Sequence, residues 1–218
     1  MGKLSASILA ADLAHLADEV ERVEAHADVI HVDVMDGHFV PPLTIGPVVV
    51  ASLRPHTRRI LHGHLMVEAP AALFDELAQA GMDVVSFHVE AVEDPAPVIE
   101  KARGSGMGVG LTVSPETPIE VVFPHLEAVD DVMVMSVHPG WAGQAFIPEA
   151  FPKLEAVRAE LERRGLSVDV EVDGGVKLDN ARRCVEAGAN VLVAASAIFG
   201  AEDPAAAARE LKAIVEAA

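Results

Sequence analysis

Residues 29–53 read VIHVDVMDGHFVPPLTIGPVVVASL, and this stretch contains the unit from which the fold is predicted. It opens with a β-branched run, Val29–Asp33, whose side chains alternate between two faces as they do in a strand. A turn rich in Gly and Pro follows, and Pro47–Leu53 is a helix candidate because Pro suits the first helical turn. The stretch therefore predicts one strand followed by one helix.

The same unit recurs outward to both ends of the chain, without a linker or a low-complexity segment. The predicted strands lie near Ser5–Leu9, Val29–Asp33, Arg59–His64, Val84–His88, Gly108–Val113, Asp131–Val137, Val168–Asp173 and Val191–Ala194. The predicted helices lie near Asp12–Ala25, Pro47–Leu53, Pro70–Ala80, Pro95–Arg103, Pro118–Glu127, Pro148–Arg164, Leu178–Ala187 and Asp203–Ala217.

Eight such units in 218 residues predict an α/β fold, a single-domain (β/α)8 TIM barrel spanning residues 1–218. A doubly wound open sheet is the alternative, but the glycine-rich dinucleotide turn expected after an early strand of such a sheet is not seen. Because the chemistry of barrels belongs at the C-terminal ends of the strands, candidate functional residues are sought there.

The composition argues against several classes of function. The chain is 51% apolar, which is too apolar for a disordered protein. Sixteen Lys and Arg against 34 Asp and Glu give a formal net charge of −18, which repels nucleic acid and anionic membranes. The only cysteine, Cys184, forms no intrachain disulfide, and the N-terminal residues lack a secretory signal, so a cytoplasmic protein is expected.

Ionisable residues gather at the ends of three predicted strands. His31 and Asp33 share one face of their strand, His64 ends the next, and Asp173 ends the seventh. Any single histidine is more simply an ordinary core or surface residue, and His62, deeper in its strand, is interpreted as structural. Four such groups at the ends of apolar strands are harder to explain that way, because unpaired buried charge is costly. The set predicts a site for zinc, ferrous iron, manganese or cobalt, among which these ligands do not select sharply.

A phosphate site is predicted beside the same strand ends. Gly174 and Gly175 follow strand seven, and residues 194–200 after strand eight are predicted to include a short extra helix. In barrels these two loops commonly hold phosphate through backbone N–H groups, so no Lys or Arg is needed. The alternative is that the two glycines only form a turn. Composition does not decide whether His138–Gln144, after strand six, closes over a ligand or is an ordinary Gly/Pro turn.

Six blocks of the chain together resemble the ribulose-phosphate 3-epimerase family. They read SASILAADLAHL, HADVIHVDVMDGHFVPPLTIGP, HLMVEAP, VMSVHPGWAGQAFIPE, VEVDGGV and VAASAIFG, in the family's order and spacing. The resemblance runs from Ser5 to about Gly200, and IHVDVMDGHFVP is its most specific stretch.

The resemblance implies a metal-dependent barrel enzyme that interconverts D-ribulose 5-phosphate and D-xylulose 5-phosphate, working as a homo-oligomer. It implies one divalent metal ion per subunit, with zinc as the first candidate, bound by His31, Asp33, His64 and Asp173. Asp33 and Asp173 would also be the acid/base pair. The residues that it assigns to substrate binding are Ser7, Met35, His64, Met66, Met135, Gly140, Trp141, Ala142, Gly143, Gly174, Gly175, Ala195 and Ser196. From the pattern alone, the three methionines are interpreted as core filler.

The chemistry of C3 epimerisation requires the same groups. A proton α to the carbonyl of a 2-ketose leaves from one face and returns on the other, so two acid/base groups should flank a planar enediolate. A metal ion stabilises the negative charge that develops, although binding it lowers a carboxylate's basicity. The hypothesis is that the stabilisation outweighs this loss.

The phosphate-side loop departs from the family pattern, which usually reads NPGFGGQ. His138, Trp141 and Ala142 stand at its first, fourth and fifth positions, and Ala195 stands where Gly is usual after strand eight. A GFAGQ-like loop occurs in the related D-allulose 6-phosphate 3-epimerase, which is the alternative activity.

Two other functions are disfavoured. The orotidine-monophosphate decarboxylase group carries an Asp-x-Lys motif after an early strand, whereas the matching triplet is Asp33-Val34-Met35, without the lysine. A non-catalytic sugar-phosphate binding barrel would be expected to lack one acid/base group, yet both aspartates are present.

Overall fold

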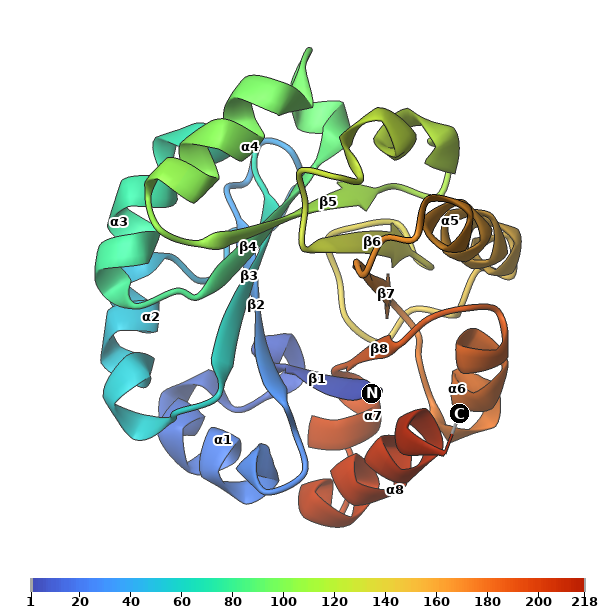
Figure 1. The fold of residues 1–218 in the computed structure, drawn as a ribbon. Coiled ribbons are helices and arrows are strands. Elements are labelled where there is room, and N and C mark those ends of the chain that lie inside the picture. Colours follow the sequence, from blue (N-terminus) through green and yellow to red (C-terminus); the bar gives the residue numbers. More distant parts are fainter. Residues whose placement is uncertain (1, 218) are drawn as a thin grey trace.

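The computed structural model describes residues 2–217 and confirms the predicted closed barrel. Eight parallel strands pair in chain order, and β8 pairs with β1 to close the ring. The strands span β1 Lys3–Ser7, β2 Val29–Met35, β3 Ile60–Met66, β4 Val84–His88, β5 Gly108–Val113, β6 Asp131–Met135, β7 Asp169–Asp173 and β8 Val191–Ala194. Figure 1 shows the strands at the centre, with the helices arranged around them.

Helices alternate with the strands along the chain. The α-helices span α1 Leu16–Glu24, α2 Pro47–Leu53, α3 Phe74–Ala80, α4 Pro95–Gly104, α5 Ala150–Arg164, α6 Leu178–Glu186, α7 Ser196–Phe199 and α8 Pro204–Glu216. Short 3-10 segments lie between them, at η1 Ile8–Ala10, η2 Leu13–His15, η3 Arg54–His56, η4 Pro70–Ala72, η5 Val89–Ala91 and η6 Ile119–His125. Within the described residues, none of the helices combines the length and apolarity needed to cross a membrane.

The main apolar core lies between the strands and the helices, and β2 shows how one strand serves two environments. Ile30, Val32 and Val34 belong to that core, because alternate strand residues point outward to the helices. His31 and Asp33 point the other way and are buried inside the barrel. The alternation in the sequence therefore determines which side chains meet in the barrel interior.

Several predicted boundaries are wrong. The first strand was expected over Ser5–Leu9 but spans Lys3–Ser7, because the Ser7 hydroxyl accepts a hydrogen bond from the Leu9 N–H and begins a 3-10 turn. The helix expected over Pro118–Glu127 is the 3-10 segment Ile119–His125. Pro124 lies inside that segment and has no N–H for an α-helical hydrogen bond.

Further helices begin later than predicted, among them α5, which begins at Ala150 and not at Pro148, and one strand ends earlier. The predicted starts at Asp12 and Pro70 fall in or before 3-10 turns, and the α-helical hydrogen bonds begin with α1 and α3. β6 ends at Met135, two residues before the predicted Val137. The short helix expected after strand eight is present as α7.

Candidate active site

The pairing of β2 with β3 brings the predicted ligands together at one end of the barrel. Asp33 lies opposite His64 in this pair, and His31 lies opposite His62 one layer deeper. Asp173 is the last residue of β7, so it reaches the same rim from another part of the barrel. Strand register thus juxtaposes residues that are far apart in the chain.

Two imidazoles and two carboxylates form one compact cluster. His64 Nδ1 lies 3.2 Å from Asp33 Oδ1 and 3.4 Å from Asp173 Oδ2. His31 Nε2 lies 3.4 Å from Asp33 Oδ1 and 3.7 Å from Asp173 Oδ2. One nitrogen or oxygen from each of the four residues lies within 4.8 Å of all the others, which is a spacing that a metal ion could bridge.

The carboxylates and imidazoles of the cluster shift one another's pKa values. Burial opposes ionisation of Asp33, but the neighbouring His31 and His64 outweigh it and hold the pKa of this carboxyl well below its usual range. Burial likewise opposes protonation of His64, but its contacts with Asp173 and Asp33 raise its pKa to about 9. The two carboxylates therefore favour a positive charge between them. Asp33 Oδ2 also accepts a 2.6 Å hydrogen bond from the Ser7 hydroxyl, which orients the carboxylate.

A cavity opens above the cluster at the C-terminal ends of the strands. All of the residues that the sequence assigned to substrate binding line it, and so do the two aspartates; these residues are Ser7, Asp33, Met35, His64, Met66, Met135, Gly140, Trp141, Ala142, Gly143, Asp173, Gly174, Gly175, Ala195 and Ser196. His31 lies behind them and has no exposed surface. The wall also contains Pro139 of the loop His138–Gln144 and residues that were not assigned to the site from the sequence, namely Leu9, Val137, Val176 and Val193.

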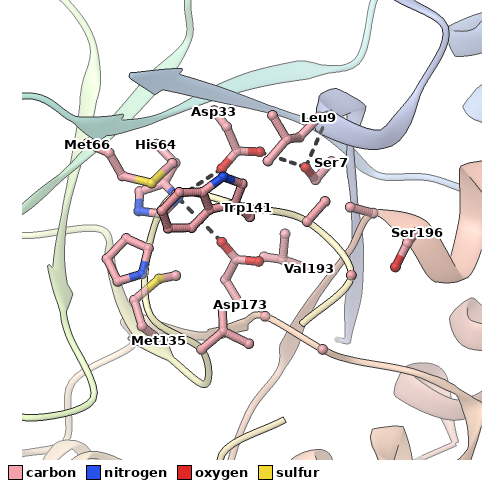
Figure 2. A pocket seen from close by; sticks show the side chains of 18 of the residues that line it. Ser7, Leu9, Asp33, His64, Met66, Met135, Trp141, Asp173, Val193 and Ser196 are labelled. Carbon is pink, nitrogen blue, oxygen red and sulfur yellow. Dashed lines mark hydrogen bonds and ion pairs between the residues drawn. The ribbon is translucent and has the colours of Figure 1, made fainter. Parts of the chain in front are cut away.

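The cavity has two chemically different ends. Figure 2 shows Asp33 and Asp173 facing each other, with His64 beside them. In this view Met66 and Met135 lie to one side and Ser196 lies to the other. The thioethers therefore flank one side of the carboxylate pair, and the loop after β8 flanks the opposite side.

The loop after β6 lies at the mouth of the cavity. Pro139, Gly140, Trp141, Ala142 and Gly143 all line the cavity, and in the view of Figure 2 the Trp141 ring is drawn between Asp33 and Asp173. Trp141 is 56% exposed, so this ring is positioned between the cavity and solvent. The Gln144 side chain stabilises the conformation of this loop, because its amide donates hydrogen bonds to the carbonyl groups of His138 and Trp141.

Two sets of buried polar residues were missed by the sequence analysis. His88, at the end of β4, lies 3.0 Å from the far side of His64, and burial lowers its pKa to about 4. Its position at the end of a predicted strand was the available signal, since His64 was placed at the end of the predicted third strand in the same way. Deeper in the barrel, His62 contacts Glu171 and Ser86, at 3.3 Å and 2.7 Å respectively. His62 does not line the cavity, but with His31 and Glu171 it forms a second group whose ligand atoms lie within 4.8 Å of one another.

Comparison with known proteins gives a consistent result. Residues 3–199 match the model of the ribulose-phosphate 3 epimerase family. A ribulose-phosphate 3-epimerase of Mycobacterium tuberculosis is 46% identical over 209 residues, which cover 96% of this chain and 91% of that protein. A rice protein (Oryza sativa subsp. japonica) named ribulose-phosphate 3-epimerase, cytoplasmic isoform, is 44% identical over 93% of this chain and 89% of its own length.

Solved structures agree on the fold. A crystal structure of KGPDC from Streptococcus mutans superposes with a TM-score of 0.75 and covers 99% of this chain and 98% of its own. The two sequences are only 17% identical, so this likeness concerns the barrel alone.

Proposed function

The chain belongs to the ribulose-phosphate 3-epimerase family and is an isomerase acting on a sugar phosphate; from this premise we propose a metal-dependent interconversion of D-ribulose 5-phosphate and D-xylulose 5-phosphate. The observation that carries the proposal is the pair of aspartates that face each other across one cavity, on strands β2 and β7. Inverting a carbon next to a carbonyl needs a proton acceptor on one face and a proton donor on the other. Two facing carboxylates suit that task.

Asp33 and Asp173 are the proposed acid/base pair. In one direction, one carboxylate takes the proton from C3, and a planar enediolate of the substrate forms between the two groups. The other, protonated, returns a proton to the opposite face of C3. The reverse reaction exchanges the two roles. Ser7 holds Asp33 by its hydroxyl hydrogen bond, so one carboxylate oxygen remains directed toward the cluster.

The residues of the cluster fit a divalent metal ion. Neither ring nitrogen of His31 has a hydrogen-bond partner within the described part of the chain, although the ring is fully buried. An imidazole without partners beside two carboxylates is the donor set expected for zinc, ferrous iron, manganese or cobalt. We infer that His31, Asp33, His64 and Asp173 hold one such ion per subunit, with zinc as the first candidate. When bound, the ion supplies Lewis-acid stabilisation of the negative charge that develops on the substrate.

The two ends of the cavity suggest how the substrate is oriented. We expect the phosphate on the side of Gly174, Gly175, Ala195 and Ser196, where loop backbone N–H groups follow β7 and β8. Met35, Met66 and Met135 lie beside the carboxylates and would pack against the carbon skeleton, since a thioether adapts to irregular shapes. Gly140, Trp141, Ala142 and Gly143 would cover the bound ligand.

D-Allulose 6-phosphate is the second candidate substrate, because the loop over the cavity differs from the usual family pattern. Trp141 and Ala142 both line the cavity, so a change in their size alters the space available to a longer sugar. The chain would then remain a 3-epimerase with the same aspartates, and only the substrate length would differ.

A coupled assay with D-ribulose 5-phosphate and D-allulose 6-phosphate side by side tests these proposals. The protein is assayed as purified, after chelation, and after addition of zinc, iron, manganese or cobalt. We expect D-ribulose 5-phosphate to turn over much faster, and activity to disappear on chelation and return with metal. Faster turnover of D-allulose 6-phosphate would assign the chain to the longer substrate. No reaction of either sugar by metal-loaded protein would refute the proposed activity.

We also propose that the protein works in the cytoplasm as a homo-oligomer. Leu13, Val48 and Val49 are exposed apolar residues that border one shallow cavity beside α1 and α2. An apolar surface of this kind is commonly covered by another chain. The single cysteine, Cys184, is buried and free, as in proteins of reducing compartments. Sedimentation analysis at several protein concentrations would measure the oligomeric state.

A further inference from the structure

Behind His64, a line of polar groups leads from the buried interior toward the partly exposed Glu90. Nε2 of His64 lies 3.0 Å from Nε2 of His88, and the two rings are tilted by only 23°. Both residues have no exposed surface, so bulk water does not offer either nitrogen another partner. His64 therefore presents Nδ1 to the two aspartates and Nε2 to His88.

Glu90 holds the other end of this line. Its Oε2 lies 3.1 Å from Nδ1 of His88. Its Oε1 accepts hydrogen bonds from the Ser114 N–H, at 2.8 Å, and from the Thr117 hydroxyl. These donors come from the segment after β5, so they fix the carboxylate independently of the cavity. Glu90 can only accept hydrogen bonds in its ionised form.

The positions of the protons follow from this arrangement. Because Glu90 accepts, the single N–H of a neutral His88 is at Nδ1, and Nε2 of His88 carries a lone pair. The only matching donor across the 3.0 Å contact is an N–H at Nε2 of His64. In the neutral form that binds a metal ion, His64 then carries its lone pair on Nδ1, the nitrogen that faces the space between Asp33 and Asp173.

We propose that His88 and Glu90 are positioning residues of the metal site, which hold His64 in the one tautomer and orientation in which Nδ1 binds the ion. The proposal rests on the metal dependence proposed above and goes beyond it, because it assigns a role to two residues that do not touch the ion. A group that hydrogen-bonds the second ring nitrogen of a metal-binding histidine fixes the orientation of the ring and increases the basicity of the ligating nitrogen. Loss of such a group costs about 10- to 100-fold in metal affinity.

Substitutions of Glu90 and His88 change the hydrogen bonds that determine the tautomer of His64 in different ways. Glu90→Gln keeps the size of the side chain, but its NH2 group can donate to Nδ1 of His88 and favour the opposite tautomer along the whole line. His88→Leu removes the acceptor for His64 altogether. His88→Gln places an amide oxygen near the former position of Nε2 and can still accept from His64.

Zinc affinity of the purified proteins tests the proposal. Each protein is stripped of metal, and its dissociation constant for zinc is measured by competition with a chromophoric chelator. We expect Glu90→Gln and His88→Leu to weaken zinc binding by about 10- to 100-fold, and His88→Gln to remain within a few-fold of the wild type. The absorption spectrum of the cobalt-loaded protein should change with the first two variants, because it reports ligand geometry.

Glu116→Gln is the matched control. Glu116 also pairs with a histidine, His138, at 3.2 Å, but both side chains are exposed and neither belongs to the cluster. This variant should bind zinc as the wild type does. Circular dichroism and thermal unfolding of the metal-free proteins distinguish loss of folding from loss of metal binding. If Glu90→Gln does not fold, the comparison of His88→Leu with His88→Gln tests the proposal.

The results distinguish this proposal from the one on which it rests. Zinc affinities within twofold of the wild type in both Glu90→Gln and His88→Leu would overturn the positioning role, while leaving the metal-dependent epimerase intact. A wild-type protein that binds no divalent ion would overturn both.

Discussion

Asp33 and Asp173 occupy different surroundings although the proposed reaction needs both. The Asp33 side chain is 4% exposed and accepts a hydrogen bond from the Ser7 hydroxyl, whereas the Asp173 side chain is 15% exposed at the cavity wall. Each is also a proposed metal ligand, so its charge affects both ion binding and proton transfer. This combination makes the pair the most informative place for a substitution.

We expect Asp33→Asn and Asp173→Asn each to abolish turnover of D-ribulose 5-phosphate, because an amide is not a base at C3. The coupled assay is run with excess metal, and metal content is measured on the same samples. Incorporation of solvent deuterium at C3 of unconverted sugar would show which aspartate acts on which face. Asp12→Asn, a change at an exposed helix cap that Asn also satisfies, is the control. Near-normal turnover in either site variant would exclude the two-base scheme.

The lowered pKa of Glu90 predicts how the free energy of unfolding depends on pH. Burial raises its pKa, but hydrogen bonds from His88, Thr117 and Ser114 outweigh this effect and lower the pKa to about 2, from an ordinary 4.5. A carboxyl with a lowered pKa in the folded state stabilises the fold above its unfolded pKa, and this stabilisation is lost as the pH falls from about 4.5 toward 2.

The free energy of unfolding of the metal-free protein, measured in urea between pH 5 and pH 3, should fall more steeply for the wild type than for Glu90→Gln. Because the side chain is 25% exposed, we expect the difference to reach only about 1–2 kcal/mol. Parallel pH profiles would show that the ionised carboxylate contributes little to stability.

At the scale of single elements, the turn after β7 tolerates no side chain. Gly174 has φ of +114°, and a Cβ at this position would lie 2.4 Å from Cγ2 of Val137. Gly165, at the end of α5, also has a positive φ, +67°, but a Cβ there would meet nothing within 4 Å. A side chain at Gly165 would therefore meet backbone strain alone, whereas one at Gly174 would also overlap Val137.

Gly165→Ala should therefore cost about 1 kcal/mol through backbone strain. Gly174→Ala adds overlap with Val137 and should cost about 2–4 kcal/mol. Urea unfolding measures both values. We also expect Gly174→Ala to raise KM for the sugar phosphate, since the turn lines the proposed phosphate end, and Gly165→Ala to leave KM unchanged. Equal losses of stability would mean that Val137 moves aside without cost.

The elements themselves were largely predictable from the sequence, whereas their ends were not. β-Branched runs between Pro and Gly turns identified eight strands, and alternation within β2 placed His31 and Asp33 inside the barrel. The end of β1 depends on one hydroxyl, that of Ser7, and the 3-10 geometry of residues 119–125 depends on Pro124. Such local hydrogen-bonding details are not encoded in periodicity.

The candidate site was predictable only where the ends of strands carry ionisable residues. Asp33, His64 and Asp173 each end one of the strands predicted from the sequence, and the structure places them in one cluster. The roles of His88 and Glu90 depend on the contact of His88 with His64 and on donors from the segment after β5, so they need the three-dimensional arrangement. The acid/base and ligand assignments themselves remain predictions.

At the scale of the whole molecule, the two ends of the chain hold each other in place. β1 pairs with β8, and α8 packs against β1. Lys212 of α8 donates a 3.0 Å hydrogen bond to the Gly2 carbonyl and pairs with Asp28 at 2.6 Å, while Lys3 pairs with Asp169 of β7. Closure of the barrel thus depends on contacts between residues more than 160 positions apart.

We therefore expect residues 1–218 to unfold as one domain, because opening the ring anywhere exposes the polar interior and the apolar core together. Calorimetry of the metal-free protein should show one transition in which the calorimetric and van't Hoff enthalpies agree. Lys212→Met removes the contacts of the ammonium group with Gly2, Asp28 and Glu216 but keeps most of the stem, and it should lower the transition temperature without splitting the transition. Two separate transitions would instead mean that part of the barrel is stable without closure, and the chain would then have to be described as two cooperative units.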